Sequence, residues 1–306
     1  MIPGGANVDA PRAPCDNRRP VRPAYRLLVT SALFASGGTL LKLCEFPSLQ
    51  RAGIRAAIAA LTIFALLPEA RRWPTARILR LFPAYFGATV LFVVANSLTT
   101  AANAIFLQSA APLWLVLLGP LLLRERPTRA DLVTLLGVGA GMTLFFLAPN
   151  AAVATAPEPR LGDWFAIASG LSYALLLVGM RWLSRAGDGE QSAAIAWGNL
   201  LTCPVALALM PVAGQQAIAG NAQDWSVIAV LGVLQVGLAY AVLVRTIAHV
   251  PAMRASLIMM VEPALNSAFA WLVHGERPHW LAMLGGALIL GSVAAAGWLA
   301  QPRRAR

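Results

Sequence analysis

Charged residues are scarce in this sequence, and the few that occur are grouped. Only 12% of the 306 residues are charged and 58% are apolar, against roughly 25% charged in an average soluble protein. Long stretches carry no charge, whereas the short stretches between them carry several. A charge in the hydrocarbon of a bilayer costs roughly 2.5–3.5 kcal/mol even on insertion scales. The pattern excludes an ordinary soluble domain and indicates a membrane protein.

Residue types that build metal, disulfide and catalytic sites are also few. The three cysteines have no close spacing, and the three histidines lie at the ends of apolar runs (Cys15, Cys44, Cys203; His249, His274, His279). Neither a disulfide framework nor a metal site follows from such spacing. The sequence contains no G-x-S-x-G elbow, phosphate-binding loop or H-E-x-x-H motif. We therefore expect no cofactor, no bound metal and no enzymatic activity.

The formal net charge of +11 could suggest a nucleic-acid partner. However, the arginines lie in short segments between apolar runs, where they would meet anionic lipid at the cytoplasmic surface. We expect the lipid bilayer as partner and no nucleic acid. Residues 1–25 are rich in Pro, Gly and Arg and have no apolar region of a secretory signal, which favours a retained, flexible cytoplasmic tail.

Apolar runs long enough to cross a bilayer recur along the chain, since about 20 residues of helix cover ~30 Å of hydrocarbon. They predict ten transmembrane helices at about 26–44, 49–67, 80–98, 102–123, 131–148, 161–182, 192–210, 224–244, 250–273 and 280–299. With the N-terminus inside, most of the 24 basic residues fall in cytoplasmic segments. This asymmetry predicts an even number of spans with both termini in the cytoplasm. The expected location is the inner (cytoplasmic) membrane of the cell.

The two halves of the sequence repeat. Pro112 precedes Glu125-Arg126-Pro127 by thirteen residues, and Pro263 precedes Glu276-Arg277-Pro278 by the same interval. The copies lie five spans apart, and an odd offset turns them toward opposite sides of the membrane. The predicted fold is an all-α polytopic membrane protein with ten transmembrane helices as two inverted five-helix repeats. The divisions are a tail (1–25), a first repeat (26–148), a linker (149–160), a second repeat (161–300) and a basic cytoplasmic tail (301–306).

Several motifs of the sequence resemble those of a known family. The stretch Thr99-Thr100-Ala101-Ala102-Asn103-Ala104-Ile105-Phe106-Leu107-Gln108, continuing through Pro112-Leu113-Trp114 to Glu125-Arg126-Pro127, looks like the fourth span of the EamA family of the drug/metabolite transporter superfamily. Glu262-Pro263 with Gly275-Glu276-Arg277-Pro278 is similar to its ninth span, and Lys42 and Arg55 fall where the family often has basic residues. The resemblance, from about residue 26 to 299, implies alternating access around a cavity lined largely by spans one, three, four, six, eight and nine. Family members carry amino acids, metabolites, nucleosides and other solutes.

Ionisable residues inside predicted spans are candidates for a substrate pathway, because they are costly there. Glu262 could couple proton binding to substrate binding, or it could be a fixed partner of Arg254 or Arg55. Arg254 could hold an anionic group of the substrate with its planar fork of donors, or it could reach the nearby interface. For Arg55, an ion pair between helices and a substrate contact are alternatives. Lys42 is expected to be an interfacial anchor or a gate.

Uncharged polar and aromatic residues extend the set of pathway candidates. They are five amides and three aromatics: Asn96, Asn103, Gln108, Gln235, Asn266, Tyr173, Tyr240 and Trp114. Hydrogen bonds between helices explain such amides without any substrate, and ordinary packing explains such aromatics. Trp164, Trp225 and Trp280 open their spans and fit an interfacial aromatic belt.

Prolines and glycines inside spans suggest where helices bend and where they pack closely. Pro112 and Pro263 remove a backbone hydrogen bond and are hinge candidates at matched places. Gly137 with Gly141, and Gly291 with Ala295, form faces of small residues that favour close helix contact within one chain or between protomers.

The sequence therefore predicts a secondary transporter, monomer or homodimer, of a small organic solute such as an amino acid or related metabolite. The family analogy favours export, and protons are a candidate coupling ion. Two alternatives from other classes are a membrane-embedded enzyme acting on lipid and a receptor that transports nothing. Short loops without a reactive cluster weigh against the enzyme.

Overall fold

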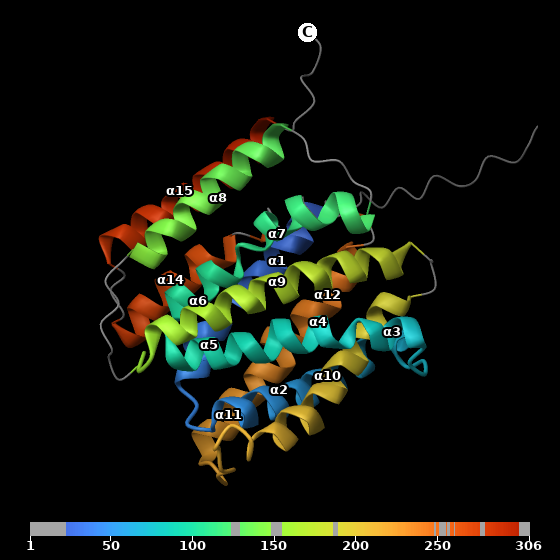
Figure 1. The fold of residues 1–306 in the computed structure, drawn as a ribbon. Coiled ribbons are helices and arrows are strands. Elements are labelled where there is room, and N and C mark those ends of the chain that lie inside the picture. Colours follow the sequence, from blue (N-terminus) through green and yellow to red (C-terminus); the bar gives the residue numbers. More distant parts are fainter. Residues whose placement is uncertain are drawn as a thin grey trace, which may run out of the picture.

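The computed structural model describes residues 23–123, 129–147, 155–185, 189–247, 249–250, 255, 258–259, 261–275 and 279–299, which are almost entirely helical (Figure 1). The helices are α1 (Pro23–Lys42), α2 (Ser48–Leu66), α3 (Ala76–Arg80), α4 (Phe82–Phe86), α5 (Phe92–Leu98), α6 (Ala101–Gln108), α7 (Ala111–Leu118), α8 (Arg129–Leu147), α9 (Pro159–Ser184), α10 (Glu190–Leu209), α11 (Ala222–Val230), α12 (Ala239–Ile247), α14 (Val261–His274) and α15 (Trp280–Leu299). Helix therefore occurs within every predicted apolar run.

Some sequence predictions lie outside the described residues. They concern most of the N-terminal tail, the C-terminal tail, Arg254, the first half of the linker, and the repeated motifs Glu125-Arg126-Pro127 and Glu276-Arg277-Pro278.

The helices have the composition of membrane spans. Within the described residues, five are long and apolar enough to cross a bilayer, namely Ser48–Leu66, Ala101–Leu118, Pro159–Ser184, Glu190–Leu209 and Ala222–Ile247, and shorter apolar helices accompany them. Large apolar side chains are also widely exposed, such as Leu121 (77%), Leu136 (74%) and Leu272 (76%). Water would oppose such a surface, whereas lipid tails favour it. The chain is a multi-pass helical membrane protein.

Three of the predicted spans consist of several helical segments, and in the eighth these are α11, a π-helical segment at Leu231–Leu238 and α12. The third consists of α3, α4, a π-helical segment at Gly87–Leu91 and α5, and the fourth consists of α6, α7 and a π-helical segment at Gly119–Leu123. The boundary between the two is sharp, because Thr99 is extended and the Thr100 side chain accepts a hydrogen bond from the Asn103 backbone N–H at 3.2 Å. That hydrogen bond caps the start of α6.

Helices of the first half pack mainly against helices of the second half. α2 packs on α10, and α8 packs on α15. α1 packs against α12 and α14, and α9 correspondingly packs against α5 and α6. Each helix has an equivalent in the other half, five predicted spans away along the chain. When every helix is replaced by its equivalent, each of these contacts becomes a contact that is also present. The core therefore has the contact pattern of two structurally equivalent repeats.

The α8–α15 pair stands at one edge of the molecule (Figure 1). A Cβ atom added at Gly141 would lie 2.7 Å from the Gly285 carbonyl oxygen, and one added at Gly137 would collide with Ser292. These glycines therefore serve contact within the chain. Gly291 and Ala295 do not, because Ala295 is exposed and no atom lies within 4 Å of a Cβ at Gly291.

We expect Gly141→Ala to destabilise the protein, because the added methyl group meets backbone of α15 that cannot rotate away. Overpacking of this kind costs about 1–3 kcal/mol, which should lower the melting temperature of the purified protein in detergent. Gly139→Ala is the matched control, since open space surrounds that position on the same helix and alanine favours the helix. Equal melting temperatures for the two variants would contradict the described packing.

Candidate functional site

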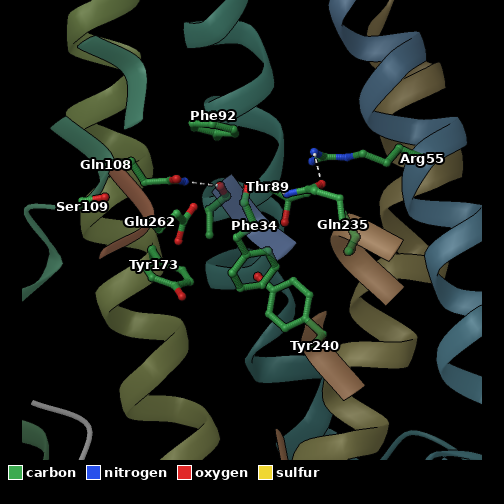
Figure 2. A pocket seen from close by; sticks show the side chains of 12 residues that line it. Phe34, Arg55, Thr89, Phe92, Gln108, Ser109, Tyr173, Gln235, Tyr240 and Glu262 are labelled. Atoms are coloured by element: carbon green, nitrogen blue, oxygen red, sulfur yellow. Dashed lines mark hydrogen bonds between the residues drawn. The ribbon is translucent and has the colours of Figure 1, made fainter. Parts of the chain in front are cut away.

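A polar cavity lies at the centre of the bundle, and both halves of the chain line it (Figure 2). Its volume is about 60 Å³. The lining residues are Phe34 of α1, Arg55 of α2, Ala88 and Thr89 of the Gly87–Leu91 segment, Phe92 of α5, Gln108 and Ser109 at the end of α6, Tyr173 of α9, Gln235 and Val236 of the segment Leu231–Leu238, Tyr240 of α12 and Glu262 of α14.

Two π-helical segments line this cavity from equivalent places in the two halves. Gly87–Leu91 lies in the third predicted span, and Leu231–Leu238 lies in the eighth, five spans later. A π-helical turn accommodates an extra residue in a helix and frequently occurs at functional sites. In this protein the two segments bring Thr89 and Gln235 to the cavity.

A break between α6 and α7 contributes the next polar side chains. The helix ends at Gln108, and Pro112 lies in the first turn of α7, where a missing N–H is tolerated. The Gln108 side-chain nitrogen donates to the Ala88 carbonyl at 3.0 Å and to the Ser169 hydroxyl at 2.7 Å. Ser169 itself donates to the Ala88 carbonyl at 2.9 Å. This network fixes the side chain of Gln108 between the third, fourth and sixth predicted spans.

Arg55 and Gln235 lie on one side of the cavity, and Glu262, Gln108 and Tyr173 lie on the other (Figure 2). Arg55 Nη1 donates to Gln235 Oε1 at 3.3 Å, and Gln235 Nε2 donates to the Phe34 carbonyl at 3.5 Å. This chain of hydrogen bonds joins α1 and α2 of the first half to the eighth predicted span.

Glu262 is half-buried in the cavity wall and forms no ion pair with Arg55, both of which the structure describes. The Arg55–Glu262 pair, one alternative from the sequence, is thus not formed in this structure, and the alternative of an Arg254 partner lies outside the described residues. The Tyr173 hydroxyl contacts the Met259 sulfur at 3.8 Å. Within the described part of the chain, no group of three or more His, Cys, Asp or Glu side chains is placed to hold a metal ion.

Aromatic rings close the cavity beside these polar groups. Tyr240 packs edge-to-face on Phe34, with ring centroids 5.1 Å apart, and lies 5.7 Å from the ring of Tyr85. Both contacts are within the range of favourable aromatic pairs. The rings give the cavity an apolar wall between the side of Arg55 and the side of Glu262.

Of the predicted pathway residues, six line the cavity, and these are Glu262, Arg55, Gln108, Tyr173, Gln235 and Tyr240. Four others lie elsewhere. Asn103 donates to Asp163 at 3.3 Å, and Asn266 donates to the Ala101 carbonyl at 3.1 Å. Asn96 is fully buried, and its amide finds no hydrogen-bond partner among the described residues. The Trp114 ring packs on the apolar core.

Six further lining residues were not predicted from the sequence: Phe34, Ala88, Thr89, Phe92, Ser109 and Val236. Two of them are phenylalanines in apolar runs and look like any residue of the core. Thr89 and Ser109 carried a weak signal, because each is a hydroxyl in an otherwise apolar stretch.

A second polar group closes one end of the bundle around Lys42. The Lys42 ammonium donates to the Thr99 carbonyl at 3.1 Å and also to the Thr155 carbonyl. The Thr99 hydroxyl in turn donates to Asp163 at 2.8 Å. These contacts tie the ends of α1, α5 and α9 together. Lys42 thus contacts protein groups at a helix end, as a gate residue would.

We expect Lys42→Met to loosen this end, because two carbonyl groups lose a charged donor. Cys44 is only 4% exposed beside it, so its reaction with a membrane-impermeant maleimide reports local opening. In a Cys15→Ser, Cys203→Ser background the rate should rise about fivefold, the effect of ~1 kcal/mol on opening. Arg245→Met, whose ion pair with Glu69 lies elsewhere, should leave the rate unchanged. An unchanged rate in Lys42→Met would show that Lys42 does not hold this end closed.

Comparisons with known proteins agree with this architecture. A solved structure titled "Crystal structure of protein" aligns with a TM-score of 0.68 over 91% of this chain and 97% of its own length, at 19% sequence identity. At that identity the likeness concerns the fold alone. No curated protein matches the chain. The profile of the EamA-like transporter family, however, matches residues 23–147 and again residues 160–298. With two repeats that together cover most of its length, the chain belongs to the EamA-like transporter family.

Proposed function

We propose that this protein is a secondary carrier that moves a small organic solute across the cytoplasmic membrane by alternating access. The amino acids and related metabolites are the proposed substrates, and export is the proposed direction. The central cavity carries the proposal, because it joins an arginine, a carboxyl group and two amides at the meeting place of both repeats. Transporters built from repeats bind their substrates at such a place.

The proposed topology has ten spans in two inverted repeats, at 26–148 and 161–300, with both termini in the cytoplasm. The exchange of equivalent contacts between the halves supports it. The exposed tryptophans Trp164, Trp225 and Trp280 near the starts of α9, α11 and α15 also support it, since this topology places all three at the outer interface.

The dimensions of the cavity support a mechanism with moving helices. Pockets that enclose drug-sized ligands measure roughly 300–1,000 Å³, far more than the present volume of about 60 Å³. A solute could therefore enter only if the lining helices separate. The proposed hinges are the break before Pro112, where the helix is already interrupted, and Pro263 in α14, whose missing backbone N–H removes a helix hydrogen bond.

Glu262 is the residue that we propose to link the solute to a proton. It faces the cavity and makes no ion pair or hydrogen bond within the described residues. A carboxyl group in such surroundings can change its protonation when a charged solute enters or leaves. The same side chain could alternatively contact only the solute, with transport then independent of pH.

The test is counterflow in proteoliposomes that contain the full chain, with a panel of labelled amino acids and nucleosides and with or without a pH gradient. We expect saturable flux that the gradient drives. Glu262→Gln should reduce it by about tenfold or more, the factor that a loss of ~1.4 kcal/mol produces. Glu45→Gln, which changes an exposed carboxylate outside the cavity, should transport as the wild type does.

Other outcomes separate the rival functions. Saturable flux that depends neither on the gradient nor on Glu262→Gln would support the carrier function and assign Glu262 a structural role. An absence of flux over a much wider panel would contradict the carrier and favour a receptor or a lipid-modifying enzyme.

A further inference from the structure

Two arginines lie one turn apart on α2 and have very different surroundings. Arg51 is 8% exposed and Arg55 is 2% exposed. Burial of a guanidinium is costly unless hydrogen bonds or an anion compensate it. The two residues therefore provide an internal comparison of how this protein compensates a buried cation.

The Arg51 guanidinium has three described acceptors, although its buried Nε, like that of Arg55, has no partner among the described residues. It donates to the carbonyl groups of Leu41 and Cys44, the latter at 3.3 Å, and to the Ser97 hydroxyl at 2.6 Å. The two carbonyls lie in and just after the last turn of α1, where helices leave carbonyl groups without partners and favour a cation. Arg51 therefore has a structural role at a helix end.

The Arg55 guanidinium has fewer hydrogen-bond acceptors than that of Arg51. Its single described acceptor is the neutral amide oxygen of Gln235, at 3.3 Å, and its buried Nε has no partner among the described residues. No described carboxylate pairs with it, and its head lies at the central cavity (Figure 2). A nearly fully buried cation with free donors thus faces the space where a solute would bind.

From this contrast, and resting on the proposed carrier function, we infer that Arg55 binds the anionic group of the transported solute, and that this group is a single carboxylate. The planar guanidinium offers two parallel donors, a geometry that matches a carboxylate. The bound carboxylate would provide the compensation that Arg51 obtains from the end of α1.

The charge of the cavity favours a carboxylate over a phosphate ester. Among the described lining residues, Arg55 is the single permanent cation, and Glu262 on the opposite side adds negative charge when ionised. A phosphate dianion would need a second cation and would be repelled by Glu262. A solute with one carboxylate near Arg55 and an apolar or cationic remainder toward Glu262 fits both sides.

Neighbouring residues hold Arg55 in position. A Cβ atom at Gly37 would lie 2.6 Å from Gln235 Nε2, so the glycine makes room for the amide that accepts from Arg55. A Cβ atom at Gly232 would lie 3.0 Å from the Arg55 carbonyl oxygen, so this glycine lets the π-helical segment approach α2. Gln235 is therefore a positioning residue for the guanidinium.

The test measures binding without transport. Melting temperatures of the full chain in detergent would be recorded with propionate and L-alanine, with their uncharged counterparts propionamide and L-alaninamide, and with phosphoethanolamine, at constant chloride. We expect the two carboxylates to raise the melting temperature in a saturable way and the other three compounds to have little effect. Equal stabilisation by the amides, or stronger stabilisation by phosphoethanolamine, would overturn the inference of a carboxylate site.

Variants assign the effect to Arg55. Arg55→Gln should raise the half-saturating carboxylate concentration by about tenfold or more, and Arg55→Lys should retain a weaker preference for carboxylates. Without ligand, Arg55→Gln should melt no lower than the wild type, because it removes an uncompensated cation, whereas Arg51→Gln should melt lower. Undiminished carboxylate binding in the Arg55 variants would overturn the inference. If one of the two variants folds poorly, the other still provides this test.

The proposed function and this inference can fail separately. If carboxylates stabilise the protein through Arg55 but no flux is observed, the carboxylate site is supported and the carrier function is contradicted. Saturable flux of amides or amines that Arg55→Gln does not change would keep the carrier and contradict the site.

Discussion

Backbone hydrogen bonding governs this structure, because no water inside a bilayer replaces a bond that a helix gives up. In most of the chain, regular helix satisfies the backbone hydrogen bonds. The exceptions include the π-helical segments Gly87–Leu91 and Leu231–Leu238 and the break after Gln108, which all line the cavity. A further π-helical segment, Gly119–Leu123, lies outside it. Most of the irregular backbone of the spans therefore lies beside the polar side chains of the cavity, where a solute and water could satisfy it.

The two repeats make this concentration possible. Neither half lines the cavity alone, since Arg55 comes from one half and its acceptor Gln235 comes from the other. The equivalent segments of the third and eighth predicted spans both line the same space. A small change in how the halves pack would alter the distance between Arg55 and Glu262. Recognition of a solute and rearrangement of the halves can thus involve the same residues.

Helix positions and much of the cavity could be predicted from the sequence, for different physical reasons. Apolar run length specifies where helices lie, because the bilayer sets the length that they need. Ionisable residues in such runs, such as Glu262 and Arg55, are so costly that a cavity is a natural place for them. Amides are cheaper, and so Asn103 and Asn266 could equally serve helix contacts, as they do here. Phe34 and Phe92 carried no signal, and π-helical turns leave no clear mark in the apolar pattern.

The α8–α15 pair is separate from the cavity. Within the described residues it contributes no side chain to the cavity, and it joins the rest mainly through α6 and α7. Its length and outer surface can therefore vary without altering the residues that meet a solute. Hydrophobic mismatch with membranes of different thickness costs only fractions of a kcal/mol per Å, and this pair is where the protein could adapt to it. Adaptation to a host membrane and choice of solute would then be separable traits of the same chain.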